Sequence, residues 1–167
     1  FGAQLAAALG LPYAFASHFA PALMMQAISL YRAGFRPSAY LERPYVMLGF
    51  NVFAADTDEE ARLIATSMQQ AFVNIRTGHP TKLPRPVPGY LDQLGPNERA
   101  LLDQVLPYSA IGSPETITRA LHDFITRTAA DELMITSQTF DYAARLRSYE
   151  ITAQARERLG ELEASQP

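Results

Sequence analysis

Segments with helical spacing alternate with short extended segments along this chain, and that alternation limits the fold more than any other feature of the sequence. The clearest extended segment is Tyr45–Phe53, whose nearly continuous apolar run is typical of a strand buried on both faces. Shorter extended segments lie at Tyr13–Ser17 and Glu132–Thr136. Strands that alternate with helices are joined by right-handed crossovers and run parallel. We therefore predict an α/β fold in which these three strands are parallel and adjacent in chain order, with helices on the outer face.

The segments between the strands have the apolar periodicity and the terminal residues of helices. Gly10 suits a left-handed position at the end of the first helix, and Thr57 and Glu60 have the spacing of a capping box. Asp141 is suited to cap the last helix. Helices are expected near 1–9, 21–34, 58–75, 114–125 and 142–160.

The segment 77–109 interrupts the alternation, because it contains six prolines and predicts only one short helix, near Asn97–Val105. We interpret it as an insertion long enough to act as a covering loop. The chain is then expected to form a single partial-barrel domain over residues 1–160, followed by a tail at 161–167. Three strands cannot close a barrel, so this pattern fits either a small open sheet or the last part of a TIM barrel of about 250 residues.

Composition excludes several classes of function. The net charge is −3, and the Lys and Arg residues are scattered singly, so the clustered cations that a nucleic-acid site needs are missing. The chain has no cysteine, which excludes disulfides, a thiolate nucleophile and Cys-based metal sites. No apolar stretch approaches the ~20 residues of a membrane span, and residues 5–16 lack the basic region of a signal peptide. We predict a cytoplasmic protein, and a chain cut from something longer.

Several groups of residues occur in the order in which one known family has them, over Phe1 to about Ala153. The groups are Phe1–Phe19, Arg36–Ser38, Asn51–Thr57, Gly112–Thr116 and Ala130–Ser137. Together they resemble the luciferase-like monooxygenase family. The resemblance implies the C-terminal part of a (β/α)8 TIM barrel, in which the chain begins with the fifth helix and the sixth strand.

This resemblance implies a fragment of a flavin-dependent oxidoreductase, a monooxygenase that uses reduced FMN and molecular oxygen on a small organic substrate. Members hold the FMN phosphate where the fifth strand turns into the fifth helix, and this chain retains only the end of that turn, at Phe1, Gly2 and Ala3. Backbone N–H groups and the helix dipole make such a terminus an anion site. The Ser and Gly residues that usually precede it lie outside the chain, so the fragment alone is expected to be inactive and to bind FMN weakly.

Polar residues directly follow two of the predicted strands. Ser17 and His18 come at the end of the first strand, and Ser137 follows the last. TIM-barrel active sites are built at the C-terminal ends of the strands. We therefore predict that Ser17, His18 and Ser137 lie on one rim of the sheet and contribute to cofactor binding together with Gly2 and Ala3.

Three other polar residues are weaker candidates. Asn51 lies in an apolar strand and needs a hydrogen-bond partner, which we expect to be a structural one, because an unsatisfied buried amide costs roughly 1–3 kcal/mol. His79 falls in the proline-rich segment, and His122 lies on a helix beside its apolar stripe. No pair of histidines has metal-ligand spacing, so no metal site is predicted. The catalytic residues are unknown, since the family takes them largely from earlier strands.

Two alternative functions stay open at this point. A deazaflavin-dependent dehydrogenase could use the same barrel, and a non-enzymatic, flavoprotein-like module could bind a partner through an open sheet. Unpaired strand edges recruit other strands. We therefore expect the chain to form a homo-oligomer or to associate with the missing N-terminal half of the barrel.

Overall fold

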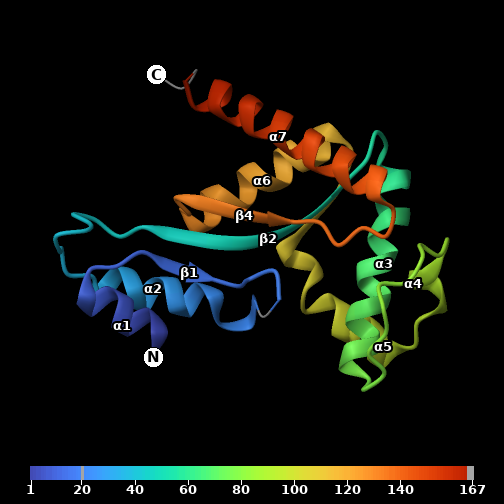
Figure 1. The fold of residues 1–167 in the computed structure, drawn as a ribbon, viewed down its shortest axis with the longest axis horizontal. Helices are drawn as coiled ribbons and strands as arrows, with labels where there is room; N and C mark the ends of the chain where they lie inside the picture. Colours follow the sequence, from blue (N-terminus) through green and yellow to red (C-terminus); the bar gives the residue numbers. More distant parts are fainter. Residues whose placement is uncertain (20, 165–167) are drawn as a thin grey trace.

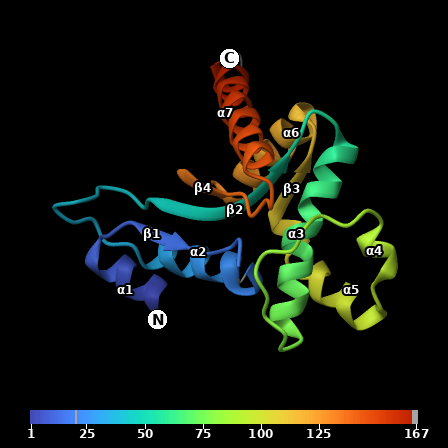
Figure 2. The ribbon, with the colours of Figure 1, turned by 45° about the vertical axis from the view of Figure 1, so that its right-hand side comes forward.

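The computed structural model describes residues 1–19 and 21–164, and helices and strands alternate in it as the sequence predicts (Figures 1 and 2). Short 3-10 helices, η1 and η2, precede α2 and β3. In chain order the elements are α1 (Gly2–Leu9), β1 (Tyr13–Phe15), η1 (Pro21–Leu23), α2 (Met24–Gly34), β2 (Val46–Ala54), α3 (Asp58–Arg76), α4 (Tyr90–Gln93), α5 (Pro96–Asp103), η2 (Leu106–Tyr108), β3 (Ser109–Gly112), α6 (Pro114–Thr128), β4 (Glu132–Thr136) and α7 (Tyr142–Ala164).

The strand β2 is the centre of a parallel sheet. β1 pairs with Val46–Leu48 of β2, and β4 pairs with Met47–Asn51. Both neighbours pair with residues 47 and 48, so they must lie on opposite edges of β2. The predicted parallel arrangement and the order β1–β2–β4 are therefore confirmed.

The predicted number of strands is wrong, because the sheet has a fourth strand, β3. It pairs in parallel with residues 51–54 of β2, beyond the stretch that pairs with β1. The backbone N–H of Ala55 extends this pairing by donating to the carbonyl of Gly112, at 3.2 Å. β3 has only four residues between η2 and the helix that begins at Pro114. A segment this short contains no periodic run that sequence patterns could detect.

The two faces of β2 have different surroundings. Alternate residues from Val46 to Ala54 belong to the main hydrophobic core, together with side chains from α1, α2, α6 and α7. We call this the outer face, and it agrees with the predicted outer helices. The opposite face, here called the inner face, carries Met47, Gly49, Asn51 and Phe53. Only Phe53 among these belongs to the second, smaller core cluster, which it forms with α3.

The proline-rich insertion, residues 77–109, lies along α3 and contains α4, α5 and η2 (Figure 1). The expected helix near Asn97–Val105 is present as α5. Two side chains of α3 bind the backbone of the insertion: the hydroxyl of Thr66 accepts from the N–H of Val87 at 2.9 Å, and Gln70 donates to the carbonyl of Arg85 at 2.9 Å. The division into one domain with an insertion and a tail stays a prediction.

The helix ends follow the sequence signals. Gly10 adopts the left-handed conformation after α1, where an added Cβ would lie 2.5 Å from the carbonyl oxygen of Arg36. The Thr57 hydroxyl accepts from the backbone of Glu60, and Asp141 accepts from the backbone of Ala144 at the start of α7. α7 continues to Ala164, whereas residues 165–167 of the expected tail lie outside the described residues. None of the described helices combines the length and the apolar character that a membrane crossing requires.

Candidate functional site at the C-terminal edge of the sheet

Asn51 of β2 binds the ends of two other segments at the C-terminal edge of the sheet. It is 3% exposed, and its side-chain amide donates to the backbone carbonyl of His18 at 2.9 Å. Its oxygen accepts from the hydroxyl of Thr136, the last residue of β4, at 2.7 Å. The residues after β1 and the end of β4 are therefore held on one rim of the sheet. The structural partners expected for this buried amide are present.

Ser17 and His18 lie against Gly49 on β2. The Ser17 hydroxyl is buried and donates to the carbonyl of Gly49 at 2.6 Å. The imidazole of His18 occupies the place of the side chain that Gly49 lacks, because a Cβ built on Gly49 would lie 1.9 Å from Nδ1 of His18. The His18 ring therefore lies on the inner face of the sheet, opposite the helices that form the main core.

Ser137 lies on the same rim, as predicted, but its side chain has a different environment. Its hydroxyl is buried and lies 3.0 Å from that of Thr139 and 3.3 Å from that of Ser148, on α7. The backbone N–H of Ser137 donates to the hydroxyl of Tyr149, at 3.2 Å. These contacts fix the loop after β4 against α7.

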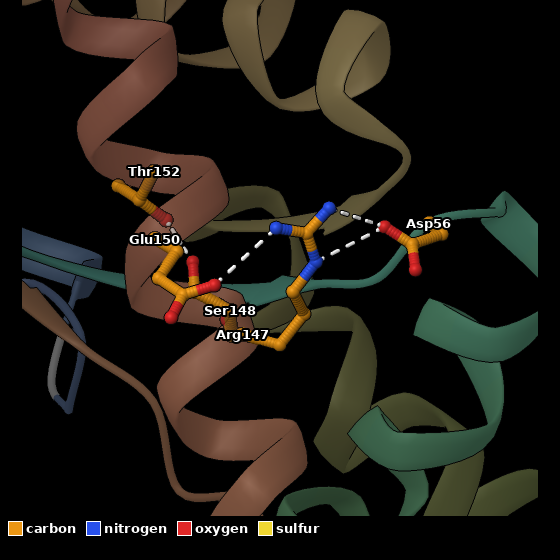
Figure 3. A network of polar contacts seen from close by, with 5 residues as sticks. All are labelled: Asp56, Arg147, Ser148, Glu150 and Thr152. Atoms are coloured by element: carbon orange, nitrogen blue, oxygen red, sulfur yellow. Dashed lines mark hydrogen bonds and ion pairs between the residues drawn. The ribbon is translucent and has the colours of Figure 1, made fainter.

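Figure 3 shows the polar contacts where the first turns of α7 approach the end of β2. Arg147 binds Asp56 at 2.6 Å and Glu150 at 3.3 Å, and the hydrogen bond to Asp56 raises the pKa of the guanidinium above its ordinary value. Both carboxylates are largely exposed and the Arg147 side chain is 43% exposed, so solvent screens the ion pairs. The neighbouring Ser148 is buried and accepts from the backbone N–H of Ala54 at 2.9 Å.

The residues predicted to bind phosphate are at the start of α1. Gly2 is exposed, and nothing lies within 4 Å of the position that its Cβ would take. Ala3 is buried against the main core. Phe1, at the cap position, provides no side-chain cap, and the first helical hydrogen bond runs from the N–H of Leu5 to the carbonyl of Phe1. The N–H groups of residues 2–4 are therefore not used within the helix.

The inner face is partly uncovered in this chain. Met134 of β4, the register partner of Gly49, is 53% exposed, and Ala14 of β1 is exposed as well. The insertion reaches the rim, because the Arg85 guanidinium lies 5.0 Å from the centre of the Phe140 ring in the loop after β4. An apolar surface with polar groups along one rim is therefore accessible in this chain.

The structure does not bring the other two histidines to this rim. His79 follows α3 in the insertion, and His122 lies on α6 beside Asp123, at 3.6 Å. Within residues 1–19 and 21–164 there is no cluster of His, Asp and Glu side chains that could hold a metal ion.

Sequence patterns alone do not reveal that Gly49 and Thr136 contribute to this site. A glycine inside a strand is a recognised sign that another group approaches the backbone closely. Gly49 is that kind of residue, although the sequence does not reveal that the approaching group is His18. Thr136 is the last strand residue, and its contact with Asn51 depends on the register of β2 and β4.

The parallel sheet, its outer helices and the polar rim at the strand ends define an α/β protein of the TIM-barrel type, represented here by part of the barrel. A family model described as luciferase-like monooxygenase matches residues 1–132. The chain belongs to this family.

Individual relatives agree with this assignment. A luciferase-like monooxygenase of Escherichia coli K12 is 45% identical over 159 residues, which are 95% of this chain and 48% of that protein. The crystal structure of apo-MsnO8 is similar with a TM-score of 0.83 and 32% identity, over 93% of this chain and 47% of that one. The chain therefore spans about half the length of the relatives that it matches.

A more distant structure shares the fold alone. It is the oxygenating constituent of 3,6-diketocamphane monooxygenase from Pseudomonas putida, a type II Baeyer–Villiger monooxygenase in complex with FMN. The TM-score is 0.56 at 19% identity, over 92% of this chain and 44% of that one. The predicted family and the predicted fold class, the C-terminal part of a TIM barrel, are confirmed.

Proposed function

We propose that this chain is the C-terminal half of the barrel of a cytoplasmic monooxygenase that acts on a small organic substrate, and that it provides part of the flavin site. The observation that carries this proposal is the position of His18, whose ring lies on the inner face at the C-terminal edge of the strands. TIM-barrel enzymes bind their substrates at this edge. When bound, reduced FMN supplies the electrons with which molecular oxygen is split between the oxidised substrate and water.

The start of α1 fits a phosphate group. The N–H groups of residues 2–4 are not used within the helix, and the macrodipole adds partial positive charge at this end. Apart from its chain neighbours and the backbone of its own helix, no atom lies within 4 Å of the Cβ position of Gly2, so the backbone is open to an anion there. α1 runs antiparallel to β1, so its N-terminus is directed to the side of the sheet on which β1 ends (Figure 1).

The rim residues have separate roles in this proposal. The N–H groups of Gly2 and Ala3 bind phosphate, and His18 contacts the ring system or the substrate on the inner face. Ser17 contributes by fixing the loop that carries His18, through its 2.6 Å bond to the sheet. Ser137 fixes the loop after β4 at the same rim, since its hydroxyl already has partners. The insertion is placed to exclude water from this rim, because Arg85 reaches the same loop.

A charge substitution at Gly2 tests the phosphate site. Gly2→Glu places a carboxylate beside the phosphate position and is compatible with the helix, because acidic residues stabilise the first turn. In the intact polypeptide that carries this chain, we expect FMN affinity to fall at least about tenfold, which corresponds to ~1.4 kcal/mol. Flavin fluorescence titration measures the affinity. Gly2→Gln, which has the same length and no charge, is the matched control and should bind FMN nearly normally.

Riboflavin separates the phosphate contact from the ring contact, since it has the ring system and no phosphate. Its affinity should be the same in the Glu and Gln variants. Equal FMN affinity in both variants would place the phosphate elsewhere. Titration with a deazaflavin in parallel decides the cofactor. Tight deazaflavin binding without FMN binding would favour a dehydrogenase on the same barrel over the monooxygenase.

A further inference from the structure

His18 contacts both Gly49 and Asn51 at the rim. These contacts do not depend on the proposed function. We propose that Gly49 and Asn51 are positioning residues that hold the His18 imidazole with its proton on Nε2, so that it donates a hydrogen bond to an acceptor on the inner face. The identity of the acceptor, a carbonyl oxygen or ring nitrogen of the flavin or substrate, rests on the proposed function. The geometry of the three residues is independent of that function.

Gly49 provides the space for the ring. A Cβ at this position would lie 1.9 Å from Nδ1, 2.8 Å from Cε1 and 3.0 Å from Cγ of His18. Two of these separations are shorter than any that real Cβ atoms tolerate, so every other residue at this position would displace the imidazole. Gly49 has an ordinary strand conformation. The reason for glycine here is therefore the close approach of the ring and not the backbone angle.

Asn51 and Ser17 fix the backbone that carries the ring. The Asn51 amide holds the carbonyl of His18, and the Ser17 hydroxyl binds the carbonyl of Gly49 on the same strand. The Asn51 side chain cannot be reversed without loss, because its oxygen accepts from Thr136 while its nitrogen donates to His18. His18 is thus tied to β2 through its own carbonyl and through the side chain of the preceding residue, so the ring has little freedom to leave Gly49.

The burial of Nδ1 decides which nitrogen carries the proton. Nδ1 of His18 is buried and has no hydrogen-bond partner among the described residues. A buried N–H without an acceptor is rarer in proteins than an unpaired acceptor, so a lone pair at Nδ1 is favoured over a proton. A neutral imidazole has one N–H. The proton is therefore on Nε2, which is not among the buried unpartnered atoms of this partly exposed residue.

The tautomer can be measured without any cofactor. Long-range ¹H–¹⁵N spectra of the intact polypeptide, labelled at histidine, distinguish a protonated ring nitrogen from one with a lone pair, and a His18→Gln variant assigns the signals. We expect Nε2 to be protonated and Nδ1 to have the lone pair at neutral pH. A proton on Nδ1, or fast exchange between the two forms, would overturn the proposal.

The variants Gly49→Ala and Asn51→Asp test the two positioning residues. Alanine at position 49 should displace the ring, and aspartate at 51 keeps the acceptor for Thr136 but removes the donor to His18. Both should replace the single tautomer by exchange-broadened His18 signals. Gly160→Ala is the control for the first variant, because nothing lies within 4 Å of that glycine's Cβ position. Unchanged His18 signals in both rim variants would also overturn the proposal.

A double variant keeps the test valid if Gly49→Ala folds poorly. If the destabilisation comes from the clash with the imidazole, adding His18→Ala to Gly49→Ala should return the urea midpoint most of the way to the parent value. An equal loss with and without His18 would show that Gly49 serves another purpose. If the tautomer is as expected but no flavin binds, the positioning role stands and the proposed function fails. If flavin binds but the tautomer is different, the proposed function stands and the positioning role fails.

Discussion

Asp58 shows how one side chain joins two segments that are far apart in the sequence. It lies in the first turn of α3, and its Oδ1 accepts from the backbone N–H of Ser113, at the start of α6, at 2.7 Å. This hydrogen bond lowers the pKa of the Asp58 carboxyl, with hydroxyl groups of Thr116 and Ser113 adding to the effect. The folded protein therefore favours the charged form of this carboxyl more than the unfolded chain does.

The pH dependence of Asp58 follows from the sign of that shift. A carboxyl whose pKa is lowered by folding stabilises the protein above its unfolded pKa of about 3.9, and the stabilisation is lost as the pH falls through the folded value. Asp58→Asn should therefore lower the urea midpoint at neutral pH, and the difference from the parent should shrink in acid. Urea unfolding at a series of pH values measures it, with the exposed Glu59→Gln as control. A difference that stays constant with pH would contradict this prediction.

Individual residues were predictable where a local signal exists. Gly10, Thr57 and Asp141 end or begin helices as the sequence indicates, because caps depend on neighbours in the chain. The positions of Ser17 and His18 at a strand end were also predictable. The packing of the His18 ring against Gly49 was not predictable, since the two residues are 31 positions apart in the sequence and only the strand register brings them together.

Among the elements, β2 was the most predictable and β3 the least. A strand that pairs on both edges and packs on both faces has a long apolar run, whereas β3 pairs, among the strands that the structure describes, only with the end of β2. The helix α7 is intermediate: its capping residue was clear, but the sequence does not show which of its many polar residues bind the strand ends, and the structure shows that Ser148 and Tyr149 do. Ser148 binds the backbone of Ala54 and the hydroxyl of Ser137, which joins α7 to two strand ends.

Removing this contact should cost more than removing the ion pairs beside it. Ser148→Ala leaves the buried N–H of Ala54 without its partner, and we expect a loss of ~1–3 kcal/mol in the free energy of unfolding. Arg147→Gln, one residue away on the same helix, breaks only exposed ion pairs and should cost at most ~1 kcal/mol. Urea unfolding compares the two variants. A larger loss for the Arg147 variant would reverse this ranking.

At the scale of the whole molecule, the chain leaves surfaces that a complete barrel would cover. One edge of β4 pairs with β2, and no other strand among the described residues pairs with β4. Beside β4 is a largely apolar cavity of about 610 Å³ between α6 and α7, lined by residues such as Leu133, Ile135 and Leu159. The relatives are about twice as long as this chain. Unpaired edges and apolar surface favour association with other chains.

We therefore expect the 167-residue chain, prepared by itself, to form dimers or larger oligomers. Sedimentation velocity at several concentrations measures the association. If the inner face takes part, Met134→Glu should shift the distribution towards monomer, because it places a charge in the middle of the exposed apolar surface. Leu30→Glu is the matched control, since Leu30 is similarly exposed but lies on α2. A chain that stays monomeric at all concentrations would show that the free edge and the inner face are already protected within the chain.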